Sequence, residues 1–349
     1  MMSAERSMPC AARRRRRTSL VGGLVAVGIV VLALGGAMAP SARAAGGKIV
    51  VGLVTKTEVN PYFVKLRQAA AAEAKKLGAT LVARAGKFDG DNEGQVRAIE
   101  DFISLGVKGI LITPNNSTGI LKAVAEARAK GILVIALDTA TDPASAVDAT
   151  IATDNFQAGV LQGEYARHAL GSKAPKLAML DGTPGATVDT ERHNGYLKGL
   201  GLTDSSPSIV GRTNTHGAQD LAQTGMENLL VAHPDINVVY SINEPAAEGG
   251  YAAIKAAGKQ NAILLTAIDG GCLGVKYVQQ GKIAATVMQF PVKMATLGVK
   301  DVVTYAKTGK KPSGFITQKS VNRATRGRQN PNSWLRFSAS PSAYLPPAE

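Results

Sequence analysis

Residues 48–63 read KIVVGLVTKTEVNPYF, and this stretch decides the fold. The apolar run over 48–54 predicts a buried strand, and the pattern that follows predicts a helix over 62–77. Between strand and helix lies a polar turn that carries Lys56, Asn60, Tyr62 and Phe63. In an open α/β sheet, ligands bind beside turns that follow the carboxyl ends of strands. The stretch therefore predicts an α/β fold with a candidate binding turn after its first strand.

Two interpretations fit the adjacent aromatic residues Tyr62 and Phe63. A ring face packs well on the C–H face of a sugar, and Asn60 and Lys56 can then reach its hydroxyls. Alternatively, the two rings fasten the helix to the sheet. The turn by itself favours neither interpretation.

Apolar runs of four to seven residues alternate with helical segments along the body of the chain. The expected strands are 48–54, 80–83, 109–112, 133–137, 150–152, 177–180, 208–211, 238–241, 264–268 and 284–288. The expected helices are 62–77, 92–105, 118–130, 155–170, 190–200, 218–233, 244–257 and 273–280. Continuous Val, Ile and Leu runs are typical of parallel strands buried on both faces. So many strands predict two doubly wound parallel-sheet lobes, with a closed eightfold β/α barrel as the alternative.

Polar side chains follow many of the predicted strand ends. Beyond the first turn they are Asp138, Asp154, Asn155, Asp181, Asp189, Arg192, Asn243, Glu244, Asp269 and Gln289. Such groups make paired hydrogen bonds to vicinal hydroxyls, although any one of them can also cap the next helix. We favour capping for Asp154 and Asn155. For Asp138, Asn243 and Asp269 we favour ligand binding, because no helix pattern follows them directly.

The first 44 residues have the pattern of an export signal. Five arginines over 13–17 precede an apolar stretch over 20–39, and Ala42-Arg43-Ala44 fits a cleavage site. The mature chain would begin near Ala45, in the periplasm or cell envelope. An uncleaved membrane anchor is the alternative, since the apolar stretch has nearly spanning length.

The formal net charge of +14 is concentrated at the two ends of the chain. Residues 1–44 carry +6 and residues 313–349 carry +4, so the body over 45–312 carries only +4. No basic stripe with interleaved aromatics remains in the body to follow a phosphate backbone, so we expect no nucleic-acid partner.

Cysteine and histidine give no sign of catalysis or of a metal site. Cys10 precedes the predicted cleavage site, which leaves Cys272 alone in the mature chain. His168, His193, His216 and His233 lack metal-ligand spacing, and we expect each at the surface. No nucleophile–base pair or phosphate-binding glycine loop is present, so we expect neither an enzyme nor a cofactor.

Several landmarks together resemble those of periplasmic sugar-binding proteins of ABC importers, the ribose-binding type. They are Asn60-Pro61-Tyr62-Phe63, Leu137-Asp138, Ala152-Thr153-Asp154-Asn155, the segment from Asn228 to Asp235, Ile268-Asp269-Gly270 and the segment from Ala285 to Gln289. The resemblance extends from about Lys48 to Pro312. Thr55-Lys56-Thr57, Ile242-Asn243-Glu244-Pro245 and Asp269-Gly270-Gly271-Cys272 look closest to the fructose-binding branch.

This resemblance implies a monosaccharide held between two hinged lobes and delivered to an ABC permease by a monomeric protein. The lobes would be 45–153 with 290–312, and 154–289. Asn60, Tyr62, Phe63 and Asp138 would bind the sugar from the first lobe. Arg192, Asn243 and Asp269 would bind it from the second, with Gln289 at a hinge. Lys56 and Asp189 complete the ligand set that we expect.

Two departures from the ribose-binding pattern bear on the sugar. That pattern has an arginine after the aspartate matched by Asp138, where this chain has Thr139. It also has an aromatic residue in the region of His216-Gly217, where none stands here. Both departures argue against ribose and leave fructose, or a similar sugar, as the expected ligand.

The last segment, 313–349, departs most from the family. It is rich in Arg, Asn, Ser and Pro and shows no clear strand or helix period. We expect a divergent and largely disordered tail, which a reading-frame shift or genuine divergence would both explain.

Two further function classes remain open. A sugar-sensing domain of a membrane receptor or regulator would use the same fold. A sugar-active enzyme would need a carboxylate pair, for which Asp138 and Asp269 are the candidates.

Overall fold

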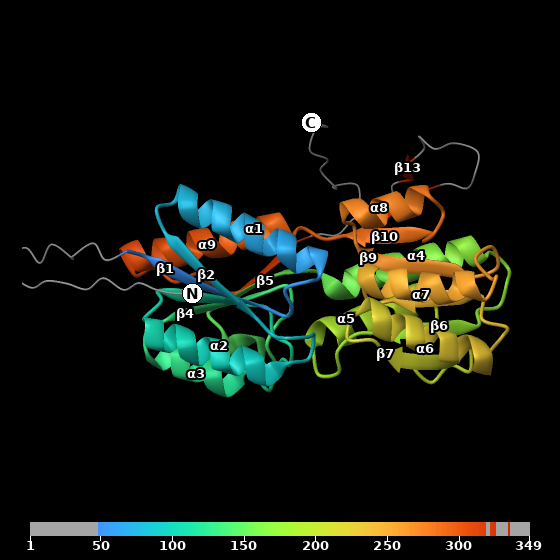
Figure 1. Cartoon of the computed structure of the whole chain (residues 1–349), viewed down its shortest axis with the longest axis horizontal. Helices are drawn as coiled ribbons and strands as arrows, with labels where there is room; N and C mark the ends of the chain where they lie inside the picture. Colours follow the sequence, from blue (N-terminus) through green and yellow to red (C-terminus); the bar gives the residue numbers. More distant parts are fainter. Residues whose placement is uncertain (1–47, 319–321, 326–333, 336–349) are drawn as a thin grey trace, which may run out of the picture. The chain divides into compact units, whose positions relative to one another are not determined.

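The computed structural model describes residues 48–318, 322–325 and 334–335, and these form two separate sheets, one parallel and one mainly parallel (Figure 1). The predicted signal lies outside the described residues. The first sheet has the order β11-β5-β4-β3-β1-β2. Its strands are β1 (Val50–Thr55), β2 (Thr80–Ala85), β3 (Gly109–Ile112), β4 (Leu133–Leu137), β5 (Ala149–Thr153) and β11 (Phe315–Gln318). All of its strand pairs are parallel.

Helices cover both faces of the first sheet. On one face lie α1 (Pro61–Lys76) and α9 (Pro291–Thr308), and on the other lie α2 (Asn92–Leu105) and α3 (Leu121–Ala129) (Figure 1). Separate apolar clusters fill the two sides, one around Leu66 and Val299 and the other around Phe102 and Ile120. The predicted first lobe includes 290–312 but no helix there, although Ala295, Val299 and Val302 recur at helical spacing within α9.

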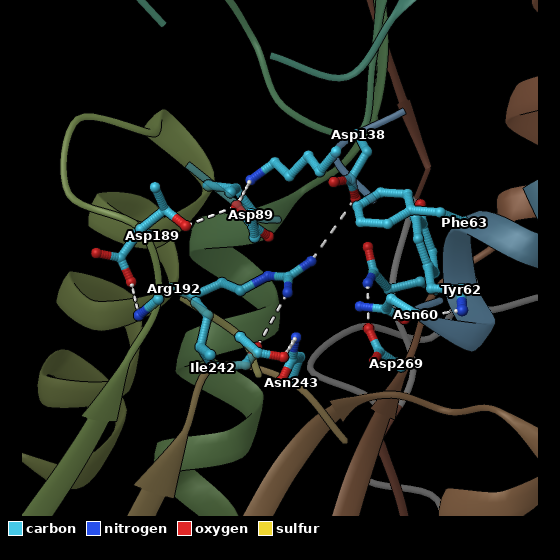
Figure 2. Close-up of a pocket in the computed structure, with 16 residues that line it drawn as sticks. Asn60, Tyr62, Phe63, Asp89, Asp138, Asp189, Arg192, Ile242, Asn243 and Asp269 are labelled. Atoms are coloured by element: carbon cyan, nitrogen blue, oxygen red, sulfur yellow. Dashed lines mark hydrogen bonds and ion pairs between the residues drawn. The ribbon is translucent and has the colours of Figure 1, made fainter. Parts of the chain in front are cut away.

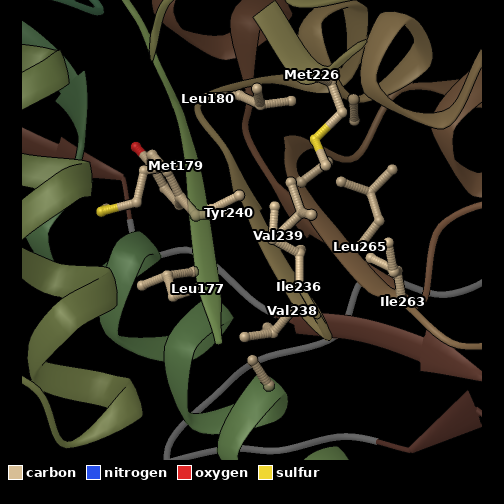
Figure 3. Close-up of a cluster of buried hydrophobic side chains, with 14 of the residues drawn as sticks. Leu177, Met179, Leu180, Met226, Ile236, Val238, Val239, Tyr240, Ile263 and Leu265 are labelled. Carbon is tan, nitrogen blue, oxygen red and sulfur yellow. The ribbon is translucent and has the colours of Figure 1, made fainter. Parts of the chain in front are cut away.

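The second sheet has the order β13-β12-β10-β9-β8-β6-β7. Its strands are β6 (Leu177–Asp181), β7 (Ile209–Asn214), β8 (Val238–Ser241), β9 (Leu264–Asp269), β10 (Ala285–Met288), β12 (Asn322–Thr325) and β13 (Trp334–Leu335). Its helices are α4 (Asn155–Leu170), α5 (Thr187–Leu200), α6 (Gln219–Ala232), α7 (Glu244–Ala256) and α8 (Cys272–Gln279). The first lobe also contains a short 3-10 helix at Ala144–Ala146. A core around Met179, Tyr240 and Leu265 fills this lobe (Figure 3). Two open, doubly wound sheets confirm the predicted fold and exclude the barrel.

Helices α4 and α5 approach until their backbones touch. A Cβ added at Gly159 or Gly163 would lie 2.3 Å from the Arg192 carbonyl oxygen or 2.2 Å from the Tyr196 carbonyl oxygen. A Cβ at Gly195 or Gly199 would meet α4 backbone oxygens at 2.1 and 2.2 Å. Only glycine leaves room for such contact, so these four positions set the spacing of the two helices.

The described chain passes between the two sheets at three places. It leaves the first sheet after β5, returns after β10 through Gln289, and leaves again between β11 and β12. The Thr153 hydroxyl donates to Gln289 Oε1 at 2.9 Å, which ties the first two passages together. Among the described helices, none has the length and apolar character needed to span a membrane.

The segment beyond Ser313 differs from the expectation of a tail without strands. Strand β11 pairs with β5, which extends the first lobe past the expected boundary at 312. Strand β12 pairs antiparallel with β10, with Ala324 opposite Ala285, and so joins the second sheet. Strand β11 lies at the edge of its sheet, and β12 lies between β10 and the two-residue strand β13. Both strands are only four residues long and carry no strong apolar pattern, so they gave little signal in the sequence. The expected disorder of the other residues past 318 falls outside the described ranges.

Candidate functional site

A cavity of about 410 Å³, partly open to solvent, is lined by loops that follow strands of both sheets (Figure 2). From the first lobe come Lys56, Asn60, Tyr62, Phe63, Asp89 and Asp138. From the second come Gly182, Thr183, Val188, Asp189, Arg192, Gly217, Ile242, Asn243 and Asp269, with Gln289 at a passage between the sheets. All ten side chains predicted from the sequence as a ligand set therefore lie around one cavity.

The first turn forms because Asn60 caps α1. Its side-chain oxygen accepts from the Tyr62 N–H at 2.9 Å, and Pro61 occupies the first helical position. The rings of Tyr62 and Phe63 meet edge to face with centroids 5.3 Å apart. Both are buried in the first-lobe core, and both also line the cavity. The two interpretations of these rings are thus compatible, since the same two side chains pack α1 against the sheet and line the cavity.

Two aspartates at strand ends, Asp138, which is buried, and Asp269, which is half-buried, have unusual backbone geometry. Asp138 follows β4 with φ of 65°, and Asp269 ends β9 with φ of 151°. His216, beside the cavity residue Gly217, has φ of 50°. In the part of the chain that the structure describes, no other non-glycine residue has positive φ. Such conformations cost free energy and concentrate at ligand sites.

Asp138 and Arg192 face each other from opposite lobes. Arg192 Nη2 lies 3.8 Å from Asp138 Oδ1, and each side chain is about 5% exposed. Neither atom has a hydrogen-bond partner among the described residues. The other Asp138 oxygen accepts from the Thr139 hydroxyl at 3.2 Å. A buried acceptor and a buried donor are therefore both available to a ligand that carries hydroxyls.

Arg192 is held in place by two acceptors. Its Nε donates to Asn155 Oδ1 at 2.9 Å, and its Nη1 donates to the Ile242 carbonyl oxygen at 3.0 Å. Asn155 also donates to the Asp138 carbonyl oxygen at 3.1 Å. We expected Asp154 and Asn155 to cap a helix. Asp154 does cap α4, but the prediction for Asn155 was wrong, because its buried amide orients the arginine instead.

Asp269 has both oxygens bound by its surroundings. Oδ1 accepts from Gln289 Nε2 at 2.7 Å, and Oδ2 accepts from the Glu244 N–H at 3.2 Å. Glu244 in turn accepts from the Thr286 hydroxyl at 2.7 Å. Burial raises the pKa of Asp269 above its ordinary value, against the opposing influence of Arg192. Burial, and then the negative charge of Asp269, raise the pKa of Glu244.

Asn243 both caps a helix and lines the cavity. Its Oδ1 accepts from the Ala246 N–H at 2.9 Å, and its Nδ2 donates to the Gly217 carbonyl oxygen at 3.1 Å. Helix α7 begins at Glu244, as the predicted helix over 244–257 does, so the separate statement that no helix pattern follows Asn243 directly was wrong. Pro245 is compatible with this start, since proline is favoured in the first helical turn.

Sequence reasoning missed a polar contact at one end of the cavity. Asp89, in the loop after β2, lies 3.5 Å from Lys56 Nζ. Its Oδ1 also accepts from the Thr183 hydroxyl, on the opposite lobe, at 2.6 Å. The available signal was a carboxylate shortly after a strand end, as at the other strands. Neighbouring Asp189 accepts from the Gly182 N–H at 2.6 Å, and burial, followed by the charge of Asp181, raises its pKa to about 6.

His193 differs from the expectation of an exposed surface histidine. Its Nδ1 lies 2.8 Å from Asp181 Oδ1, its Nε2 lies 2.9 Å from Asp204 Oδ1, and its side chain is only 15% exposed. Asp181 is thereby engaged away from the main cavity. Among the described residues, no group of His, Cys, Asp or Glu is arranged to hold a metal ion.

The fold and this cavity define a class of protein. Residues 51–311 match the periplasmic binding protein domain. The chain belongs to the periplasmic binding protein family. Its relatives are substrate-binding proteins and not enzymes, so the enzyme alternative is set aside.

Two curated relatives import or bind sugars. The chain is 33% identical to the ribose import binding protein of Bacillus subtilis, over 77% of this chain and 87% of that protein. It is 30% identical to the D-allose-binding periplasmic protein of Escherichia coli, over 74% of this chain and 85% of that protein.

Solved structures agree with this assignment. An ABC transporter periplasmic solute binding protein from Actinobacillus succinogenes, with bound D-allose, is 29% identical with a TM-score of 0.71. That match covers 79% of this chain and 97% of the other. A galactofuranose binding protein is 27% identical with a TM-score of 0.73, over 79% of this chain and 94% of the other.

Proposed function

We propose that this protein is an exported binding protein that captures a neutral monosaccharide between its lobes and delivers it to an ABC permease. One observation carries the proposal. Asp138 Oδ1 and Arg192 Nη2 are buried, lack hydrogen-bond partners among the described residues and face each other across the cavity. A sugar hydroxyl both donates and accepts, so vicinal hydroxyls can satisfy the acceptor and the donor together.

The charges around the cavity favour a neutral ligand. Four carboxylates, from Asp89, Asp138, Asp189 and Asp269, outnumber the two cations Lys56 and Arg192. An anionic sugar phosphate or sugar acid would meet this excess of negative charge at short range. Tyr62 and Phe63 supply the apolar surface on which the C–H face of a sugar ring packs.

Among neutral sugars, we propose fructose or a similar monosaccharide as the preferred ligand. Thr139 stands where the ribose-binding pattern has an arginine, and the region of His216-Gly217 has no Phe, Tyr or Trp. The curated relatives are named for ribose and allose, so these two sugars are the comparison ligands. Delivery to a permease rests on the family, and export rests on the signal-like pattern of residues 1–44.

Thermal shift and calorimetry with the mature protein test this proposal. D-Fructose, D-ribose and D-allose would each be added to the wild-type protein in separate experiments. A ligand that binds only the native state at one hundred times its Kd stabilises it by about 2.7 kcal/mol, which raises Tm by several degrees. Binding of D-fructose more tightly than D-ribose is expected. No stabilisation by any neutral pentose or hexose would overturn the sugar-binding proposal, whereas tighter binding of D-ribose would overturn only the preference.

A further inference from the structure

Asp89 connects the two lobes at one end of the cavity. It lies in the loop between β2 and α2, and its Oδ1 accepts from the Thr183 hydroxyl of the second lobe at 2.6 Å. The same oxygen lies 3.5 Å from the ammonium of Lys56, whose side chain is 5% exposed. Both contacts use Oδ1, and neither uses Oδ2. Asp89 is therefore fixed in position while its second oxygen takes no part in these two bonds.

The cavity has two chemically different ends. In the view of Figure 2, the Arg192 guanidinium lies between Asp89 on one side and Tyr62 with Asn60 on the other. Aromatic rings form one wall, whereas Lys56, Asp89 and Thr183 form a polar end. Gly217 packs closely against this end, because a Cβ there would lie 2.6 Å from Asn243 Nδ2 and 3.7 Å from Asp89 Oδ2, so only glycine fits beside the two side chains. A ring packed on the aromatic wall would direct a substituent toward Asp89.

We propose that Asp89 is a specificity-determining residue that accepts a hydrogen bond from an exocyclic hydroxymethyl group of the sugar. Hexoses and ketohexoses carry such a group, and aldopentoses in their pyranose form do not. The Asp89 side chain is 13% exposed and is held by its contacts with Lys56 and Thr183. A site built to hydrogen-bond a hydroxyl discriminates against an analogue that lacks it. The inference rests on the proposed sugar-binding function and specifies its substrate class.

The contact with Thr183 gives a competing explanation that the test must separate. If Asp89 only holds the lobes together, its removal weakens binding of every sugar by the same factor. If Asp89 contacts the hydroxymethyl group, its removal weakens only sugars that carry this group. D-Allose and D-ribose form a matched pair, since they share the configuration of their common ring carbons and differ by one hydroxymethyl group. D-Fructose and 1-deoxy-D-fructose form a second pair that differs by one hydroxyl.

Calorimetry on the mature protein would compare the wild type with Asp89→Asn and Thr183→Val. Asp89→Asn is expected to lower the affinity for the sugar with the exocyclic hydroxyl at least tenfold and that for its partner at most twofold. Thr183→Val removes the bond between the lobes and leaves Asp89 and Lys56, so it should lower the affinity for both members of a pair alike.

Equal losses for both members of each pair in Asp89→Asn, or no loss for either, would overturn the role of Asp89. Failure of the proposed function would look different, because the wild type itself would then bind none of the four sugars. Circular dichroism of each variant checks the fold. Glu93→Gln, at a position in the first turn of α2 whose side chain is 89% exposed, serves as a control for a charge change nearby.

Discussion

Asp138 and Asp269 occupy equivalent places in the two lobes, yet their surroundings differ. Both stand at the carboxyl end of a strand with positive φ, and both line the cavity. Asp269 has each oxygen bound within its own surroundings, by Gln289 and by the Glu244 N–H. Asp138 has one oxygen without a hydrogen-bond partner among the described residues. The Asp138 carboxylate is therefore available to a ligand, whereas the Asp269 carboxylate also stabilises its own lobe.

Arg192→Met should have the largest effect, because it removes the cation that stands near both carboxylates. Asn155 Oδ1 and the Ile242 carbonyl oxygen would lose their donor, and Asp138 would lose its facing charge. Removing one partner of a buried charged group costs about 3–5 kcal/mol. We expect sugar affinity to fall more than 100-fold and unfolding free energy to fall by about 2 kcal/mol or more, as measured by calorimetry and urea titration. Arg167→Met, at an exposed position of α4, is the control and should change neither quantity.

Asp138→Asn and Asp269→Asn form a direct test of the comparison. Asn at 138 can still accept from the Thr139 hydroxyl, so its Tm should stay within about two degrees while affinity falls about 10- to 100-fold. Asn at 269 must place an amide N–H against either Gln289 Nε2 or the Glu244 N–H. We therefore expect that variant to lose about 1–3 kcal/mol of stability in addition to affinity. Equal stability losses in both variants would show that the two carboxylates have the same role.

A smaller effect concerns Asp189, which makes the unfolding free energy depend on pH. Asp189 has its pKa raised to about 6, first by burial and then by Asp181, from an unfolded value near 3.9. The folded state therefore holds this proton more tightly than the unfolded state does. The stability that results is fully present below about pH 3.9 and is lost as pH rises through about 6.

Asp189→Asn removes this pH-dependent contribution. Relative to the wild type, the variant should gain about 1–3 kcal/mol of unfolding free energy between pH 4 and pH 7. Urea titrations at several pH values measure the difference, with Asp220→Asn at an exposed position of α6 as the control. A constant difference across this range would mean that Asp189 does not titrate as its burial implies.

Much of the site could be predicted because strand ends are visible in the sequence. Asp138 and Asp269 follow apolar runs directly, and their places at the cavity follow from the topology of parallel sheets. Asp89 was missed because it stands six residues after the predicted strand end at 83, whereas Asp138 and Asp269 follow their strands directly. The role of Asn155 could not be predicted, because it depends on a contact with Arg192, 37 residues away. Strand β12 was missed because its pairing uses the backbone.

The four glycines at the contact of α4 and α5 would couple a rotation of the second lobe to the position of Arg192 in the cavity. Helix α4 starts where the chain leaves the first sheet, and α5 carries Arg192. Because the two backbones are in contact, no side chain lies between them to absorb a rotation. The two helices would therefore rotate together as one rigid unit about the start of α4 at Asp154, and Arg192 on α5 would move with them. The orientation of Arg192 therefore depends on glycine at these four positions. A single Gly163→Ala substitution, outside the cavity lining, would push α5 away from α4 and so change the orientation of Arg192.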